Sequence, residues 1–179
     1  MAVLDQLTSQ DAMALENKFG AHNYHPLPVV LSKGDGVYVW DVEGKKYYDF
    51  LSAYSAVNQG HCHPKIIGAM INQAQTLTLT SRAFYNDVLG KYEKFATQLF
   101  GFDKLLPMNT GAEAVETALK LCRKWAYEVK NINENDAEII VCKNNFHGRT
   151  TTIISFSNDP VARKNFGPYT DGFIKIEYD

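Results

Sequence analysis

The amino-acid sequence predicts an α/β fold with a mainly parallel sheet. Two short apolar runs, residues 104–108 and 138–142, predict strands, and residues 111–129 between them place apolar side chains at helical spacing. A third apolar run, at residues 173–178, predicts a further strand. Strands that alternate with helices favour a parallel sheet whose crossover connections are right-handed.

The region before residue 51 predicts smaller elements. Residues 9–19 have the pattern of a short helix that ends at Gly20. Two prolines favour an extended, irregular path through residues 21–31. Residues 37–50 alternate in character on both sides of a turn near Glu43-Gly44, which predicts a β-hairpin.

Two helices are expected between the hairpin and the predicted sheet. The first lies in the stretch HPKIIGAMINQAQ and begins at Pro64, because proline suits the first turn of a helix. The second is longer and carries apolar and aromatic side chains from Tyr85 to Leu99 on one face. Beyond the strand at 138–142, a helical turn is expected after Thr150.

The composition is that of a soluble globular protein. Of 179 residues, 45% are hydrophobic and 21% are charged, and the net charge of -2 argues against nucleic-acid binding. No apolar run approaches the roughly 18 residues that a membrane helix needs. The first residues resemble neither a secretory signal nor an Arg-rich transit peptide, which predicts a cytoplasmic protein. A mitochondrial matrix protein whose transit peptide had been removed would look the same.

The cysteines and histidines do not predict a metal site. The three cysteines are odd in number and have no C-x-x-C spacing, which indicates reduced thiols. His61, Cys62 and His63 are good zinc ligands by type, but adjacent residues rarely converge on one ion, and no further cluster completes a tetrahedral site. Because Pro64 follows it, His63 is expected to be a helix cap or turn residue.

Two polar stretches follow predicted strands and indicate a ligand site. Asn109–Ala112 comes directly after the first strand and Asn144–Arg149 after the second, and ligands of parallel sheets bind beyond the carboxyl ends of the strands. Thr110 and Glu113 fit a capping box, and Gly111 permits close approach to the exposed amides of a helix start, where anions bind. The alternative is a capped helix without a ligand.

Two side chains of the second stretch suit a flat, negatively charged ligand. The Phe146 ring can stack on a planar group, and the Arg149 guanidinium can clamp a carboxylate with two hydrogen bonds. The alternative is a loop aromatic packed on the core and a solvated arginine.

The sequence resembles the class III, fold-type I aminotransferases, which use pyridoxal 5'-phosphate (PLP). The resemblance rests on NQGHCHP at 58–64, TSRAFYN at 80–86, MNTGAEAVETALKLCRKW at 108–125 and NNFHGRT at 144–150. It implies an N-terminal segment, residues 1–50, that belongs to the small domain and contains a helix and a hairpin. It also implies that residues 51–179 are the first part of the large, mainly parallel-sheet domain that binds PLP.

The resemblance also implies roles for particular residues. Thr110, Gly111 and Ala112 match the loop that holds the PLP phosphate, and Phe146 matches the aromatic residue that stacks on the pyridine ring. Three further residues match positions that contact the substrate: Tyr24, Tyr54 and Arg149, with Arg149 at the substrate's α-carboxylate and Tyr24 near its α-amine.

Within the family, the stretches FGAHNYHPLPVVL at 19–31 and FLSAYSAVNQGHCHP at 50–64 resemble members that act on ornithine. They imply transfer of the δ-amino group of L-ornithine to 2-oxoglutarate in a homodimer. His147 stands where animal ornithine enzymes have tryptophan, and members that act on acetylornithine or 4-aminobutyrate have histidine there. Those amine donors therefore remain alternatives.

The lysine that forms the Schiff base with PLP is expected beyond Asp179, as is the aspartate that pairs with the pyridine nitrogen. No catalytic residue is therefore assigned within residues 1–179. The chain ends on a predicted strand with nothing after it to cover the sheet, so it is expected to be an incomplete N-terminal part that is inactive alone. A non-catalytic fragment or binding module is the remaining alternative.

Overall fold

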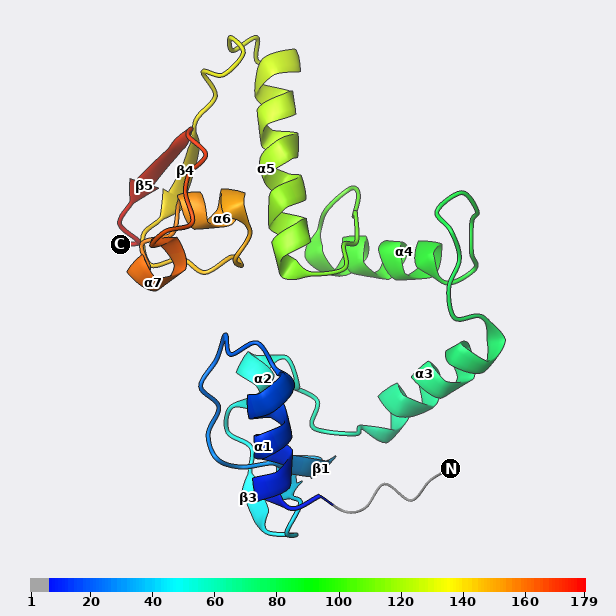
Figure 1. Ribbon diagram of the computed structural model, residues 1–179. Coiled ribbons are helices and arrows are strands. Elements are labelled where there is room, and N and C mark those ends of the chain that lie inside the picture. The colour runs from blue at the N-terminus through cyan, green and yellow to red at the C-terminus, as the bar shows by residue number, and fades with distance from the viewer. Residues whose placement is uncertain (1–6) are drawn as a thin grey trace. The chain divides into compact units, whose positions relative to one another are not determined.

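The computed structural model describes residues 7–179 (Figure 1). The chain forms two compact units, Met1–Asn86 and Asp87–Asp179. The boundary expected after residue 50 separates the small and large domains implied by the family resemblance. It is a different division from that between the two units, and it stays a prediction. Within residues 7–179, no helix is both long enough and apolar enough to span a bilayer.

The first unit contains helix α1, Ser9–Phe19, with the predicted bounds. The Thr8 hydroxyl accepts a hydrogen bond from the Asp11 amide at 3.2 Å, which satisfies one amide that a helix start leaves without a partner. The Glu43 carboxylate accepts hydrogen bonds from the Ser9 amide at 2.8 Å and from its hydroxyl at 2.6 Å. The start of α1 is thereby tied to the turn after β2.

A three-stranded antiparallel sheet follows, in the order β1-β2-β3. The predicted hairpin is confirmed, because β2 (Tyr38–Asp41) pairs with β3 (Lys46–Tyr48). Strand β1 (Leu31–Asp35) adds a pairing that the sequence did not indicate. Its sequence has no regular alternation, so its pairing with β2 rather than its own pattern makes it a strand.

The buried Asp41 carboxylate gives this unit a predicted acid sensitivity. The Tyr47 hydroxyl donates to Asp41 Oδ2 at 2.7 Å and the Lys45 amide donates to Oδ1 at 2.7 Å. The hydrogen bond from Tyr47 is the main reason that the pKa of Asp41 lies below its ordinary value of 3.8. A lowered folded-state pKa stabilises the fold above pH 3.8, and this stabilisation is lost as the pH falls further through the folded-state pKa.

We therefore expect the Tyr47→Phe variant to be less stable at neutral pH and to lose less of its stability on acidification below pH 3.8 than the unaltered chain. Trp40 fluorescence during urea unfolding at several pH values measures this, in a Trp125→Phe background that leaves Trp40 as the sole tryptophan. An identical pH dependence in both proteins would contradict the assignment.

A short left-handed turn and a helix follow the sheet in the first unit. The element α2, Ser52–Ser55, is a single left-handed turn in which all four residues have φ between 47° and 70°. Residues other than glycine adopt this conformation at a cost of about 1–2 kcal/mol each. Helix α3, Pro64–Thr76, begins at the predicted proline and has His63 as its N-cap residue, as expected.

The second unit opens with two helices. Helix α4, Leu89–Phe100, begins later than predicted and leaves Tyr85 outside it. Asn86 and Asp87 lie between Tyr85 and the start of α4. Asparagine and aspartate side chains compete with the helical backbone for hydrogen bonds, which explains the later start. Helix α5, Gly111–Glu128, confirms the helix predicted at 111–129. The last residue of the predicted range, Val129, is its C-cap.

The prediction of a strand at residues 104–108 is wrong. These residues have no regular secondary structure, and no strand within residues 7–179 pairs with them. Pro107 has no amide hydrogen to donate to a neighbouring strand. An apolar run alone therefore did not identify a strand here, because a strand is defined by its pairing.

The parallel pairing of the last two predicted strands is confirmed. Strand β4 (Ile139–Cys142) pairs in parallel with β5 (Phe173–Ile176). Two short helices, α6 (Thr151–Ser155) and α7 (Pro160–Arg163), lie in the connection between them. Helix α6 confirms the predicted helical turn after Thr150, whereas α7 was not foreseen. Buried residues of α5, β4, α6 and the residue after α6 form one core cluster: Leu119, Val141, Ile153 and Phe156.

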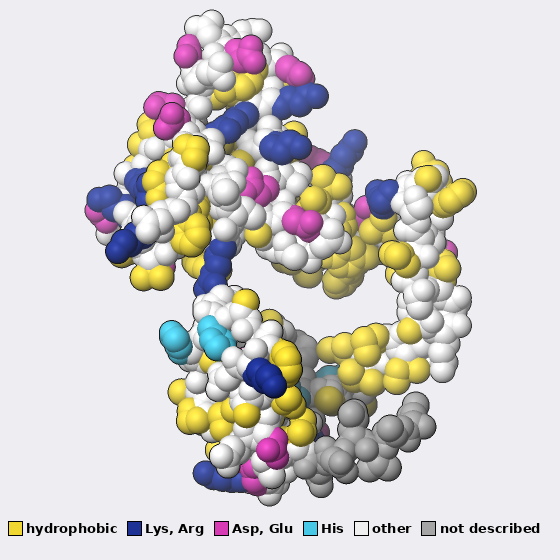
Figure 2. Space-filling view, viewed as in Figure 1, with side chains coloured by type: hydrophobic (Ala, Val, Ile, Leu, Met, Phe, Trp, Pro, Cys, Tyr) yellow, Lys and Arg dark blue, Asp and Glu magenta, His cyan; other side chains and the backbone are white. Residues whose placement is uncertain are grey.

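Helices α3 and α4 expose apolar side chains, which appear in yellow over both helices in Figure 2. Helix α3 contains no buried residue, and α4 buries only Ala96. Apolar surface of this extent is typical of surfaces that another polypeptide segment covers. The exposed side chains of the two helices include Ile66, Met70, Ile71, Tyr92, Phe95 and Leu99.

Candidate functional site

The start of α5 has one of the two hydrogen bonds of the capping box that its sequence predicts. Thr110 is the N-cap residue, with extended backbone, and its hydroxyl accepts a hydrogen bond from the Glu113 amide at 3.1 Å. The Glu113 carboxylate accepts in turn from the Asn109 amide at 3.0 Å, one residue earlier than in a standard capping box. The first intrahelical bond runs from the Ala114 amide to the Thr110 carbonyl, so the Gly111 amide points out of the helix end.

The segment after β4 is fixed by its own hydrogen bonds. Asn144 adopts φ 57°, which asparagine tolerates well, and turns the chain away from the strand. The Asn145 side-chain amide donates to the Cys142 carbonyl at 2.6 Å and, less closely, to the Phe156 carbonyl at 3.4 Å. This anchorage leaves the Phe146 ring exposed, with 75% of its surface accessible.

The structure brings the two predicted stretches together. A Cβ atom added at Gly148 would lie only 2.8 Å from the Ala112 Cβ, so the loop backbone passes directly against the first turn of α5. The Thr150 hydroxyl also donates to the Glu116 carboxylate, one turn further along the helix. Both contacts join segments that are more than thirty residues apart in the sequence.

A substitution can test whether Gly148 allows the loop to pass this close to α5. It has φ +128°, and alanine there would need an unfavourable backbone as well as a displaced Ala112. We expect Gly148→Ala to destabilise the second unit by about 1–3 kcal/mol. Urea unfolding monitored by Trp125, in a Trp40→Phe background, measures the change.

The matched control is Gly90→Ala in the first turn of α4. A Cβ there meets no atom within 4 Å, so alanine should leave stability unchanged or raise it by up to about 1 kcal/mol. Equal effects at Gly90 and Gly148 would show that the contact with Ala112 does not matter.

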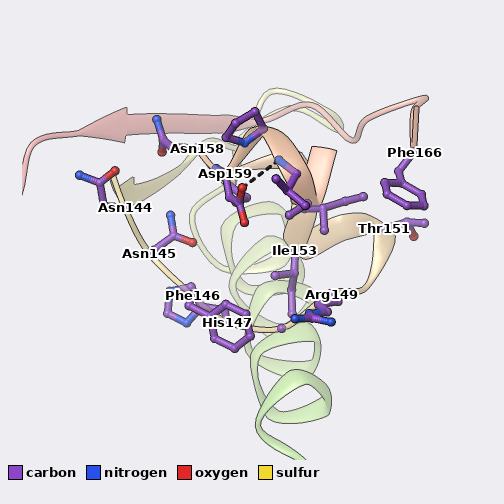
Figure 3. Close-up of a pocket in the computed structure, with 16 residues that line it drawn as sticks. Asn144, Asn145, Phe146, His147, Arg149, Thr151, Ile153, Asn158, Asp159 and Phe166 are labelled. Carbon is purple, nitrogen blue, oxygen red and sulfur yellow. Dashed lines mark hydrogen bonds between the residues drawn. The ribbon is translucent and has the colours of Figure 1, made fainter. Parts of the chain in front are cut away.

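A cavity of about 650 Å³ lies beside this junction. In Figure 3 the segment 144–149 runs along one side of it, and the side chains of Phe146 and His147 lie next to each other. Asn158 and Asp159 also line the cavity, and the Asp159 carboxylate accepts from the Val161 amide at 2.8 Å at the start of α7. The lining thus combines an arginine, aromatic rings, amide groups and one carboxylate that caps α7, and the arginine with the aromatic rings suits a planar anion.

The predicted residues are distributed unevenly around this cavity. Phe146 and Arg149 line it, whereas Thr110, Gly111 and Ala112 do not and adjoin it through Gly148. Tyr24 and Tyr54 lie in the first unit, where 58% and 84% of their surfaces are exposed. Their roles stay predictions.

Four further lining residues, Ser157–Pro160, were not predicted from the sequence. The available signal was the order Asn-Asp-Pro, since an aspartate before a proline is typical of a helix start. Nearby, the Lys175 ammonium donates to the Ser157 carbonyl at 3.0 Å, and burial is the main cause that lowers the pKa of Lys175.

No group of three or more His, Cys, Asp or Glu side chains in residues 7–179 is arranged to hold a metal ion. His61 is instead paired with a carboxylate, since its Nε2 lies 2.7 Å from Asp49 Oδ2. All three cysteines are free thiols.

Comparison with known proteins gives one family throughout. Residues 19–179 match the family model described as aminotransferase class-III. An ornithine aminotransferase of Drosophila ananassae, named as mitochondrial, is 66% identical over 171 residues, which are 96% of this chain and 40% of that protein.

Two solved structures are similar over nearly the whole chain. An ornithine aminotransferase from Toxoplasma gondii, described with partial occupancy of PLP at its active site, has a TM-score of 0.95 and 51% identity over 98% of this chain and 41% of its own. An acetylornithine aminotransferase from Elizabethkingia anophelis has a TM-score of 0.80 and 70% identity over 95% of this chain and 41% of its own.

The chain spans about 40% of the length of the relatives it matches. These neighbours confirm the predicted fold class, a fold-type I aminotransferase-like α/β fold. Because the family model covers all but the first 18 residues, the chain belongs to the class-III aminotransferases.

Proposed function

We propose that a polypeptide of the relatives' full length that carries this chain transfers the δ-amino group of L-ornithine to 2-oxoglutarate with PLP, giving glutamate-5-semialdehyde and glutamate. The junction of α5 with the loop after β4, where Gly148 meets Ala112, is the observation that supports a cofactor site most directly. The 66% identity to an ornithine aminotransferase supports the choice of substrate.

The residues at the junction fit PLP. A Cβ at Gly111 would meet no heavy atom within 4 Å apart from its chain neighbours and its own helix backbone, so no other segment covers this residue. Thr110, Gly111 and Ala112 would hold the phosphate through a hydroxyl and backbone amides, at a helix end that favours negative charge. The exposed ring of Phe146 would cover the pyridine ring. When bound, PLP supplies an electron sink for cleavage of bonds at the substrate's amine-bearing carbon.

The chain's own residues would decide which amine of ornithine reacts. Arg149 would bind the α-carboxylate and Tyr24 the α-amine, so that the δ-amine points toward the cofactor. Tyr54 would line the same substrate site. A hydrogen bond to a charged group contributes about 1.5–3 kcal/mol, enough to favour one orientation by tenfold or more.

Acetylornithine is a second candidate donor, supported by a specific observation. His147 stands beside Phe146, and the structural neighbour that is 70% identical is named an acetylornithine aminotransferase. Turnover of ornithine, acetylornithine and 4-aminobutyrate, compared at equal concentration, separates these possibilities. A preference for acetylornithine would overturn the ornithine assignment and leave the cofactor assignment intact.

The proposal extends to assembly and compartment. A homodimer would cover apolar surface such as that on α3 and α4. The naming of the Drosophila relative as mitochondrial favours a mitochondrial location over the predicted cytoplasmic one. The Schiff-base lysine is expected beyond Asp179, so residues 1–179 alone should bind PLP weakly and should not turn over ornithine.

The first experiment is the visible absorption spectrum of the full-length protein with PLP, before and after addition of ornithine. We expect a band of protein-bound PLP that bleaches with ornithine and returns with 2-oxoglutarate. The 179-residue chain, mixed with PLP in the same way, should show no response to ornithine. A full-length protein that ignores every amine donor would refute the proposed function.

A further inference from the structure

The left-handed turn Ser52–Ser55 requires support from outside itself. Four successive residues other than glycine have φ between 47° and 70°, a region that such residues rarely occupy. The turn leaves 84% of the Tyr54 side chain exposed. Backbone hydrogen bonds to the turn run from the Ser55 amide to the Leu51 carbonyl at 3.3 Å, from the Ala56 amide to the Ala53 carbonyl at 3.3 Å and from the Val57 amide to the Ser52 carbonyl at 3.0 Å.

The support comes from the carboxylate of Asp49. Its Oδ1 accepts hydrogen bonds from the Ser52 amide at 2.8 Å and from the Leu51 amide at 3.1 Å. The Ser52 hydroxyl donates to the Asp49 carbonyl at 3.2 Å. The amide of Ser52 and, after it, the side chain of His61 are the main causes that lower the pKa of Asp49. One carboxylate oxygen therefore fixes both amides at the entrance to the turn.

The second carboxylate oxygen of Asp49 is held by His61. His61 Nε2 lies 2.7 Å from Asp49 Oδ2, and both side chains are mostly buried, with 26% and 17% of their surfaces exposed. The two residues are twelve positions apart, so the contact closes a loop that contains the whole turn. His61 thus holds the carboxylate in the orientation in which it caps the turn.

His61 itself is fixed by the turn between β1 and β2. Gly36 and His61 exchange backbone hydrogen bonds in both directions, at 2.8 and 3.0 Å. A Cβ at Gly34 would lie 2.8 Å from the Cβ and Cγ atoms of His61, so the backbone of β1 leaves the imidazole no space to move toward it. The hairpin, His61, Asp49 and the left-handed turn form one continuous chain of contacts.

We propose that Asp49 and His61 are positioning residues, which hold the turn Ser52–Ser55 and thereby place Tyr54 for contact with the substrate. The inference rests on the proposed function, because Tyr54 is assigned to the substrate site there. It gives His61, in the stretch His61-Cys62-His63, a role that requires no metal.

Two variants of His61 test this in the full-length enzyme. His61→Ala removes the hydrogen bond to Asp49, whereas His61→Gln offers an amide nitrogen at the position of Nε2. We expect His61→Ala to raise the KM for ornithine about fivefold or more, with kcat and PLP affinity changed less than twofold. His61→Gln should restore most of the KM, and His22→Ala, at an exposed histidine of the same unit, should have no effect.

Gly34→Ala provides an independent route, since it displaces the imidazole without changing its chemistry. It should raise the KM for ornithine in the same way as His61→Ala. Amide hydrogen exchange of the peptide that contains Leu51 and Ser52 reports the turn directly, and it should be faster in His61→Ala and Gly34→Ala than in His61→Gln.

The outcomes separate this inference from the proposed function. An unaltered enzyme that does not turn over ornithine would refute the proposed function. An active enzyme in which His61→Ala speeds exchange but leaves the KM for ornithine unchanged would overturn the positioning role alone. Equal exchange in His61→Ala and His61→Gln would show that the hydrogen bond to Asp49 does not hold the turn.

Discussion

Replacement of Phe156 by alanine is expected to unfold most of the second unit or to lower its stability by about 3–5 kcal/mol. Only 1% of the Phe156 surface is exposed, and its ring centroid lies 4.6 Å from that of Phe173. The ring joins the core cluster that α5, β4 and α6 share. Domains of this size are stable by only about 5–15 kcal/mol, so a cavity here removes much of the total.

Trp125 fluorescence during urea unfolding measures this loss, in a Trp40→Phe background that removes the other tryptophan. Phe146→Ala is the matched control, because it makes the same chemical change at a ring that is 75% exposed. That control should alter stability by no more than about 0.5 kcal/mol. If the two variants were equally stable, Phe156 could not be the centre of the core.

Local sequence signals set the bounds of the capped helices α1 and α5, but they misplaced the start of α4, missed α7 and did not identify every strand. Helix α1 has the predicted bounds, and α5 differs by one residue, because caps, glycine stops and helical spacing act within a few residues. A strand requires a partner that is distant in sequence. Residues 104–108 and β1 show both errors: the first is apolar without a partner, and the second is paired without a pattern.

The candidate site was predicted where it depends on strand ends and failed where it depends on packing. The polar stretch after β4 led to Phe146 and Arg149, which line the cavity, whereas the strand expected before Asn109–Ala112 does not form. The contact of Gly148 with Ala112 and the position of Ser157–Pro160 depend on how α6 and α7 pack after the loop. No short sequence pattern specifies that packing.

Arg149→Gln is expected to lower kcat/KM for ornithine about 10- to 100-fold in the full-length enzyme. This range corresponds to the roughly 1.5–3 kcal/mol that a hydrogen bond between charged groups contributes. Arg149 lies on the cavity lining after Phe146, where a guanidinium can bind a carboxylate with two parallel hydrogen bonds. Arg149→Lys keeps the charge but loses the second hydrogen bond to the carboxylate, so its activity should lie between those of the unaltered enzyme and Arg149→Gln.

Steady-state kinetics with two amine donors identify the group that Arg149 binds. 1,4-Diaminobutane is ornithine without its carboxylate, and it should react poorly with the unaltered enzyme and equally poorly with Arg149→Gln. The advantage of ornithine over the diamine should therefore shrink by the same factor that kcat/KM for ornithine loses. A similar loss for both donors would mean that Arg149 supports the loop or the cofactor, since an arginine that binds only the carboxylate cannot affect a donor that lacks one.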